Sequence, residues 1–408
     1  MAASSPQTSG PPSAGGPTTP QREIDLLDHA LYEGGPQETY SWLRDHAPIY
    51  WDERNQIWGI SRHADIVRIS RDPERFSSAA GSRPNTEGSG SMIDRDDPKH
   101  LAFRRIFAKQ ITPRGVREFT PRVQRIVDDL FAKLEGKNEF DLVHELAIPL
   151  PVRVILEALG LDHEDWPRYA HIAEVTMAAG GGPRYLSEEA KQLAGGFYAE
   201  AIQESAKRKA APTDDWLSLI TQHADSGPAA RTPVEIAAEA LLFLNGGSDT
   251  TRHVIAGGSL ALMENPVQYA LLRNEPERLP VAIEEMVRWV TPLLNMRRTA
   301  TEDTEMHGQT IRKGQEVLLM YAAANRDERV FENPQQFDIT RHPNPHLAFG
   351  IGAHFCMGAN IARMELRCMF DSILRKFPQL ERAESGPLQI SAPAFACGLK
   401  ALPVRLAA

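Results

Sequence analysis

Apolar residues recur every three or four positions over most of residues 101–296, and this spacing predicts a series of helices. Apolar and polar residues alternate instead near residues 305–321 and 388–402, which predicts small sheets late in the chain. Between Tyr40 and Ile60 the pattern predicts the end of a helix followed by a short hairpin. The chain is therefore expected to have a mainly α fold with minor β structure.

Composition and charge narrow the class of protein. Residues 1–21 are rich in Ser, Pro, Gly and Thr, so we expect a disordered tail, followed by one domain over residues 22–408. The net charge of -9 argues against a general binder of nucleic acid. We find neither an apolar run of about 20 residues nor a signal peptide, and the three cysteines lack paired spacing. We expect a cytoplasmic protein without a transmembrane segment.

The strongest chemical signal is FGIGAHFCMG at residues 349–358, where Cys356 stands just before a helical pattern over about residues 359–375. Free backbone N–H groups and the positive end of the helix dipole stabilise a thiolate at such a position. The glycines allow the backbone to pass close to a flat ligand. A lone cysteine is more often a small buried hydrophobe, but these neighbours favour a metal ligand.

These ten residues closely resemble the haem-binding loop of cytochromes P450, and further motifs of that family follow in order over roughly residues 43–402. The resemblance implies the family's fold, a triangular helical prism with small sheets, as a single catalytic domain. It implies haem b between a long central helix and the helix after the cysteine. Cys356 would ligate the iron, and Phe349, Gly350 and Gly358 would lie beside the haem.

A long helical pattern from Pro233 to Asn265 contains LLFLNGGSDTT at residues 241–251. Each mid-helix glycine costs about 1 kcal/mol relative to alanine, which suggests a local widening or the close approach of something flat. By itself the acid and hydroxyl pair of Asp249 and Thr250 would be an ordinary polar face. The resemblance implies that this pair delivers protons to the reacting dioxygen, with Asp249 in place of the more usual glutamate.

Two sets of charged residues also match the family. Glu285 and Arg288 share a helix face and would be worth only about 0.3–0.5 kcal/mol as an exposed pair. The resemblance implies that they join Arg341 in a structural cluster around the haem loop. Buried haem propionates need cationic partners, and the matching positions are His100, Arg104, Arg298 and His354.

The resemblance implies a monomeric monooxygenase that hydroxylates an apolar small molecule: a steroid, terpenoid, fatty acid or polyketide. No dinucleotide fingerprint is present, so electrons would come from NAD(P)H through a separate ferredoxin and ferredoxin reductase. Residues expected to line the substrate pocket are Met92, Ile93, Phe243, Leu244, Gly247, Leu293, Leu294, Met296 and Phe395.

Three alternatives remain open at this point. A peroxide-driven haem-thiolate enzyme would need no redox partner, but the Asp249–Thr250 pair argues against it. A hydrolase with Cys356 as nucleophile and His354 as base is disfavoured, because two positions apart is an awkward geometry and no orienting third residue is apparent. A haem carrier or gas sensor would leave the acid and hydroxyl pair unexplained.

Overall fold

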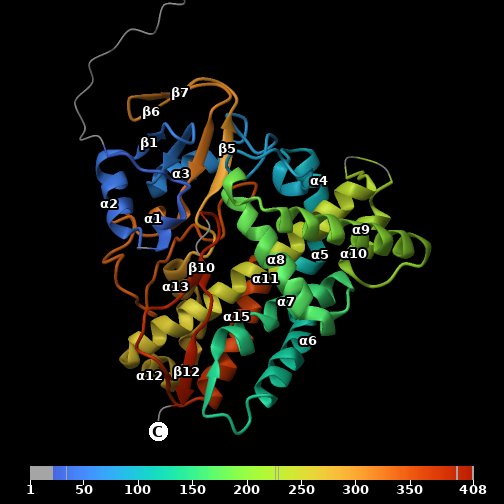
Figure 1. Cartoon of the computed structure of the whole chain (residues 1–408), viewed down its shortest axis with the longest axis vertical. Coiled ribbons are helices and arrows are strands. Elements are labelled where there is room, and N and C mark those ends of the chain that lie inside the picture. The colour runs from blue at the N-terminus through green and yellow to red at the C-terminus, as the bar shows by residue number, and fades with distance from the viewer. Residues whose placement is uncertain (1–21, 34, 226, 228, 392–393, 407–408) are drawn as a thin grey trace, which may run out of the picture.

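The structure is a computed structural model that describes residues 22–33, 35–225, 227, 229–391 and 394–406 (Figure 1). The expected tail at residues 1–21 lies outside this range. The α-helices in order are α1 (His29–Glu33), α2 (Gln37–His46), α3 (His63–Ser70), α4 (Lys99–Ile106), α5 (Ala108–Ile111), α6 (Pro113–Ala132), α7 (Pro149–Leu159), α8 (Trp166–Ala178), α9 (Glu188–Ala210), α10 (Trp216–Gln222), α11 (Pro233–Glu264), α12 (Pro266–Asn274), α13 (Leu279–Val290), α14 (Tyr321–Ala324) and α15 (Ala359–Lys376).

Short helical turns and strands complete the fold. The other helical turns are η1 (Met92–Asp94), η2 (Val143–Ala147), η3 (His163–Asp165), η4 (Ala179–Gly181), η5 (Pro183–Tyr185) and η6 (Pro276–Arg278). The strands are β1 (Ile49–Asp52), β2 (Ile57–Ile60), β3 (Phe76–Ser77), β4 (Glu139–Asp141), β5 (Met296–Ala300), β6 (Thr304–Met306), β7 (Gln309–Ile311), β8 (Glu316–Leu319), β9 (Leu380–Arg382), β10 (Ile390–Ser391), β11 (Gly398–Leu399) and β12 (Pro403–Leu406).

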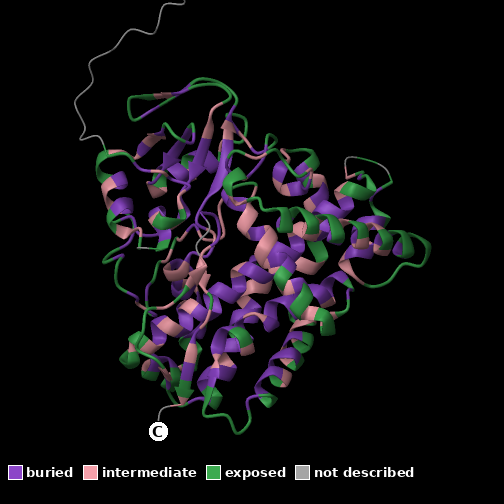
Figure 2. Ribbon diagram, in the orientation of Figure 1, coloured by how far each residue is buried: buried purple, intermediate pink, exposed green. Residues whose placement is uncertain are grey.

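Helix α11 crosses the middle of the molecule and is the element around which the others pack (Figure 1). It starts with a capping box in which Thr232 and Glu235 each accept a backbone N–H of the other. Its neighbours include α7, α8, α9, α13 and α15. Figure 2 shows buried residues along the central helices and exposed ones on the outer faces. A helix enclosed in this way is apolar around most of its surface, as the sequence of α11 is.

Within the described residues the strands form four small sheets, and strands β9 and β11 also contact the central helix α11. The largest has the order β1-β2-β8-β5-β3, with β2 and β8 parallel and the other pairs antiparallel. A second sheet, β4-β12-β9, brings the chain's last strand between two earlier ones. The pairs β6–β7 and β10–β11 are separate ribbons. The mainly helical class with minor sheet is confirmed, as is the hairpin expected between Tyr40 and Ile60.

Helix α11 is continuous through its mid-helix glycines, so the local widening that they suggested is not seen. A Cβ on Gly247 would lie 2.8 Å from Ile155 of α7, so this glycine allows the two helices to approach closely. A Cβ on Gly246 would meet nothing within 4 Å. None of the helices in the described ranges has the length and apolarity that crossing a bilayer requires.

One buried carboxylate ties α13 to the segment before the cysteine loop. Glu285 is fully buried and accepts hydrogen bonds from Arg288 Nε and Nη2, both at 2.7 Å, and from Arg341 Nε at 3.0 Å. It also accepts from the Asp338 backbone and from Asn344. Arg288 Nη1 in turn donates to the carbonyls of Asn325 and Pro334. The structure thus brings the three residues of the expected cluster together.

Replacing Glu285 with alanine should lower the free energy of unfolding by about 3–5 kcal/mol, because two buried guanidinium groups would lose their carboxylate. Denaturant unfolding measures this change. The control is Glu118→Gln, which affects an exposed ion pair with Arg114 on α6 and should change the value by less than about 1 kcal/mol. Equal stability of the two variants would contradict the structural role of Glu285.

Candidate active site

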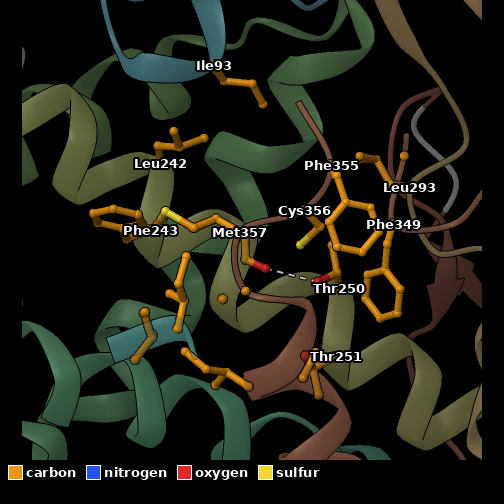
Figure 3. Close-up of a pocket in the computed structure, with 18 of the residues that line it drawn as sticks. Ile93, Leu242, Phe243, Thr250, Thr251, Leu293, Phe349, Phe355, Cys356 and Met357 are labelled. Atoms are coloured by element: carbon orange, nitrogen blue, oxygen red, sulfur yellow. Dashed lines mark hydrogen bonds between the residues drawn. The ribbon is translucent and has the colours of Figure 1, made fainter. Parts of the chain in front are cut away.

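A large apolar cavity lies between α11, α15, the loop that contains Cys356 and the turn η1 (Figure 3). It contains about 1590 Å³ of space, its opening included. In Figure 3 the sulfur of Cys356 points into the space between Phe243 on one side and Phe349 on the other.

The loop before α15 is folded tightly against the rest of the chain. The backbone N–H of Cys356 donates to the Phe349 carbonyl at 2.8 Å, which closes the loop. Gly350 and Gly352 have φ values of 66° and 78°, the region that favours glycine. A Cβ on Gly352 would stand 2.2 Å from the carbonyl oxygen of Ser70, so no other residue fits there. The geometry explains two of the glycines in the motif.

Opposing effects act on the Cys356 thiol. Burial raises its pKa above the ordinary value, whereas backbone N–H groups of Gly358 and Ala359 and the charges of Arg104 and Arg363 lower it. The net direction is upward in the unliganded chain. A metal ion bound to sulfur would displace the proton, and the same N–H groups and cations would then stabilise the thiolate.

Positive charge gathers beside this thiol. Arg104 and Arg298 both line the cavity, and each donates only to backbone oxygens, of Phe355 and Arg297 respectively, at 2.7 Å. Within the described residues neither of them pairs with a carboxylate. His100 and His354 also line the cavity, and their rings stack with centroids 4.1 Å apart.

The two histidines differ from the arginines in charge. Burial and the nearby charges of Arg298, His100 and Arg104 lower the pKa of His354 to about 2, so its ring is neutral at physiological pH. Burial likewise lowers the pKa of His100, although Asp97 at 3.2 Å opposes the shift. An anion bound here would find two guanidinium groups and two ring nitrogens in reach.

Thr250 and Asp249 occupy different surroundings although they are adjacent. Thr250 lines the cavity and its hydroxyl donates to the Gly246 carbonyl at 2.9 Å, the dashed line in Figure 3. Asp249 is absent from the lining and is buried on another face of α11, with Arg252 at 2.7 Å and His253 at 3.6 Å. Burial would raise the pKa of Asp249, but Arg252 and His253 bring it below the ordinary value. The acid therefore reaches the cavity only through its neighbours.

Six of the nine residues expected to form the substrate pocket line the cavity: Met92, Ile93, Phe243, Gly247, Leu293 and Met296. The placement of the other three was wrong. Leu244 faces the core between α11 and its neighbouring helices, one position round from Phe243. Leu294 packs with the N-terminal segment, and Phe395 lies against Gly180 and under the Arg83 guanidinium. Adjacent residues of a helix face different sides, so Leu244 points away from the cavity although Phe243 lines it.

Several lining residues were missed from the sequence, among them Ile155, Trp216, Tyr321, Met357 and Glu365. Glu365 is nearly fully buried on α15, and burial raises its pKa well above the ordinary value. The sequence did contain a signal for Glu365. It lies four residues after Ile361, so it falls in the apolar stripe of that helix, where a carboxylate is unexpected. The others lack such a signal, because they come from elements far apart in the chain.

These features fit a haem group and a thiolate ligand. Cys356 is the one cysteine among the described residues that line this apolar cavity, which suits an iron with one axial thiolate ligand. Two unpaired guanidinium groups and two histidines provide partners for the two carboxylates of the propionates. Gly246 also lines the cavity, and because it has no side chain it leaves room over a flat ring. The fold and site therefore define a haem-thiolate protein of mainly helical class.

Comparison with known proteins gives the family. The family model for cytochrome P450 matches residues 184–406. The chain is 37% identical over 387 residues to a steroid C26-monooxygenase of Mycolicibacterium smegmatis, covering 94% of this chain and 96% of the relative. It is 36% identical to a methyl-branched lipid omega-hydroxylase of Mycobacterium bovis, with 95% and 96% covered. The structure of CYP109E1 from Bacillus megaterium in complex with testosterone superposes with a TM-score of 0.85 at 30% identity, covering 92% and 98%.

The chain belongs to the cytochrome P450 family and is a monooxygenase with a haem-iron cofactor. This result removes the hydrolase and the gas sensor from the open alternatives.

The close contact at Gly352 yields a prediction with a matched control. Gly352→Ala should lower the haem content of the purified protein and its stability, because the new Cβ collides with the Ser70 carbonyl. Gly308→Ala introduces the same kind of strain, with φ at 76°, where a Cβ meets nothing within 4 Å. The Gly308→Ala control should lower the free energy of unfolding by about 1–2 kcal/mol and should keep its haem. Haem absorbance per protein and thermal unfolding measure both, and equal effects would show that the collision is harmless.

Proposed function

We propose that this monooxygenase hydroxylates an apolar molecule of the steroid or lipid class, using electrons from a ferredoxin and its NAD(P)H-dependent reductase. The observation that carries the proposal is the placement of the Cys356 thiol and the Thr250 hydroxyl on one apolar cavity. The wall is almost wholly hydrophobic above the thiol, which favours an apolar substrate. Relatives named for steroid and lipid oxidation support the same class.

Different residues of the chain would bind the iron and the propionates of the haem. Cys356 Sγ would ligate the iron, while Arg104, Arg298, His100 and His354 would hold the propionates. When bound, the haem supplies an iron that accepts single electrons and activates dioxygen. Phe349 lies beneath Arg363, whose guanidinium carbon is 4.5 Å from the ring centroid, and this contact fixes the wall next to the thiol.

Protons would enter the cavity at Thr250. Because the Thr250 hydroxyl donates to Gly246, its oxygen keeps lone pairs with which to accept a hydrogen bond from a bound water. Asp249 stays ionised through Arg252 and would act behind Thr250, as a transient acceptor that relays protons from solvent toward that hydroxyl. The network gives the acid an indirect role and the alcohol the direct one.

A partner that donates electrons would dock on the side of the molecule nearest Cys356. Phe355 is 40% exposed there, directly before the thiol. Among nearby cations, Arg105, Lys109 and Arg367 are exposed and form no ion pair within the described part of the chain. Arg363 is instead paired with Glu284 at 2.7 Å, and Arg114 with Glu118. The basic patch available to an acidic ferredoxin thus consists of Arg105, Lys109 and Arg367.

The proposed function is tested by reconstituting the haem-loaded chain with a ferredoxin, its reductase and NADPH, and by screening steroids, fatty acids and terpenoids. We expect hydroxylated product from at least one apolar class, with a spectral change on binding. The reduced protein should give the red-shifted carbon monoxide band of thiolate ligation, and Cys356→His should abolish it. Product formed with hydrogen peroxide but not with electron donors would favour the peroxide-driven alternative. A parent spectrum without the thiolate band would refute the proposal.

Thr250→Ala should uncouple electron use from product formation. A positioned proton donor contributes roughly 10²–10⁴-fold to a rate, so we expect product per NADPH to fall about tenfold or more while NADPH oxidation continues. Thr250→Ser keeps the hydroxyl and should retain most of the coupling. Product, NADPH and hydrogen peroxide are measured together with a bound substrate. Unchanged coupling in Thr250→Ala would remove this residue from the proton route.

A further inference from the structure

The roof of the cavity is a segment at residues 81–95 that is organised around one carboxylate. Asp94 is buried and accepts four hydrogen bonds, from the backbone N–H and hydroxyl of Ser82 at 2.9 and 2.6 Å and from those of Ser89, both at 2.7 Å. Met92 and Ile93, in the turn η1 beside Asp94, line the cavity. Asp94 thus ties the turn that carries both side chains to Ser82 and Ser89.

An ion pair joins the roof segment to the start of α11. Arg95 Nη2 binds Glu235 Oε1, and Arg95 Nε donates to the Gly90 carbonyl at 3.0 Å. The other oxygen of the carboxylate, Glu235 Oε2, accepts from Thr232 N at 2.8 Å and from its hydroxyl at 3.0 Å. One side chain thus closes the capping box of α11 with one oxygen and holds the roof with the other.

A second ion pair lies deeper in the protein. Its acid, Glu239, is one helical turn after Glu235 on α11. Arg231 Nε stands 3.4 Å from Glu239 Oε1, and both side chains are almost completely buried. Burial raises the pKa of Glu239 to about 8. Arg231, the Met92 backbone N–H and, to a smaller extent, Arg95 oppose this rise. Tyr198 of α9 faces the same carboxylate. The roof segment therefore meets α11 at two carboxylates four residues apart.

The two pairs differ in their access to solvent. The side chains of Arg95 and Glu235 are 18% and 28% exposed, so dissolved salt reaches the outer pair, whereas the inner pair is shielded. Glu235 precedes Thr250 by 15 residues of continuous helix, which is about 22 Å at 1.5 Å per residue. A change in the outer pair can therefore shift Met92 and Ile93 at a distance from Thr250.

We propose that the Arg95–Glu235 ion pair is a specificity-determining clamp, which fixes the roof segment over the cavity and thereby sets how long a bulky apolar ligand stays bound. Arg95 and Glu235 are positioning residues, because they act through Met92 and Ile93. The inference rests on the proposed function of the cavity and adds to it the residues that determine retention and the upper size of the substrate.

Glu235→Gln is the most informative variant. Glutamine also closes a capping box, so the start of α11 is preserved while the charge that holds Arg95 is lost. The probes are imidazole and 4-phenylimidazole, which bind haem iron whatever the natural substrate is. Stopped-flow spectroscopy should show the dissociation rate of 4-phenylimidazole rising roughly fivefold, the effect of a partly exposed ion pair. The smaller imidazole, which does not reach the roof, should leave at the parent's rate.

A double-mutant cycle and a salt series identify the pair itself. Arg95→Gln should match Glu235→Gln, and the double variant should release the ligand no faster than either single one. Raising the salt concentration should accelerate release from the parent toward the rate of the variants, which salt should barely affect. The control is Glu381→Gln, in the exposed Arg405–Glu381 pair of the β4-β12-β9 sheet, which should behave as the parent does.

Hydrogen exchange provides a readout that does not depend on the haem. Backbone amides at residues 92–94 should exchange faster in Glu235→Gln than in the parent, and those at residues 246–251 should not change. Unaltered exchange at the roof together with unaltered release of 4-phenylimidazole would overturn the clamp. If the parent binds no azole, the proposed function fails, and the exchange rates alone decide: faster exchange at the roof supports the clamp and equal exchange overturns it.

Discussion

Burial of the Cys356 thiol against an apolar cavity is the constraint on which the rest of the structure depends. In such a place the neutral thiol is favoured, and burial raises its pKa. The chain offsets this with two backbone N–H groups at the start of α15 and with the guanidinium groups of Arg104 and Arg363. A loop that presents these groups has to turn tightly against α3, which only glycine at position 352 permits. The position of the Cys356 thiol and the fold of its loop therefore depend on each other.

The charged groups behind the cysteine loop are paired differently from those that line the cavity. Glu285 neutralises Arg288 and Arg341 behind the cysteine loop, where no ligand reaches them. On the cavity side, Arg104 and Arg298 keep their charge without a carboxylate partner within the described residues, ready for an anionic group. On α11, Arg252 keeps Asp249 ionised, and at its first turn Glu235 binds Arg95.

Much of the fold and part of the site could be predicted from the sequence. The long helix and the helix after the cysteine were expected near their observed bounds, because 3.6-residue periodicity and flanking prolines mark them directly. Of the residues expected in the substrate pocket, Met92, Phe243 and Met296 line the cavity, whereas Leu244, Leu294 and Phe395 do not. Neighbouring positions differ only in the direction of their side chains, and that direction depends on packing that a sequence pattern does not record.

The sequence by itself determined the kind of chemistry through a series of motifs that resembles the cytochrome P450 family, because neither the cysteine at a helix start nor the acid–alcohol pair is specific when taken alone. Only the tertiary structure decided that Thr250 reaches the cavity while Asp249 turns to Arg252, and that Arg363 is paired with Glu284 instead of free. It also revealed the attachment of the roof to α11, which joins residues 140 positions apart. Such contacts depend on which surfaces meet when helices pack, and distance along the chain carries no information about that.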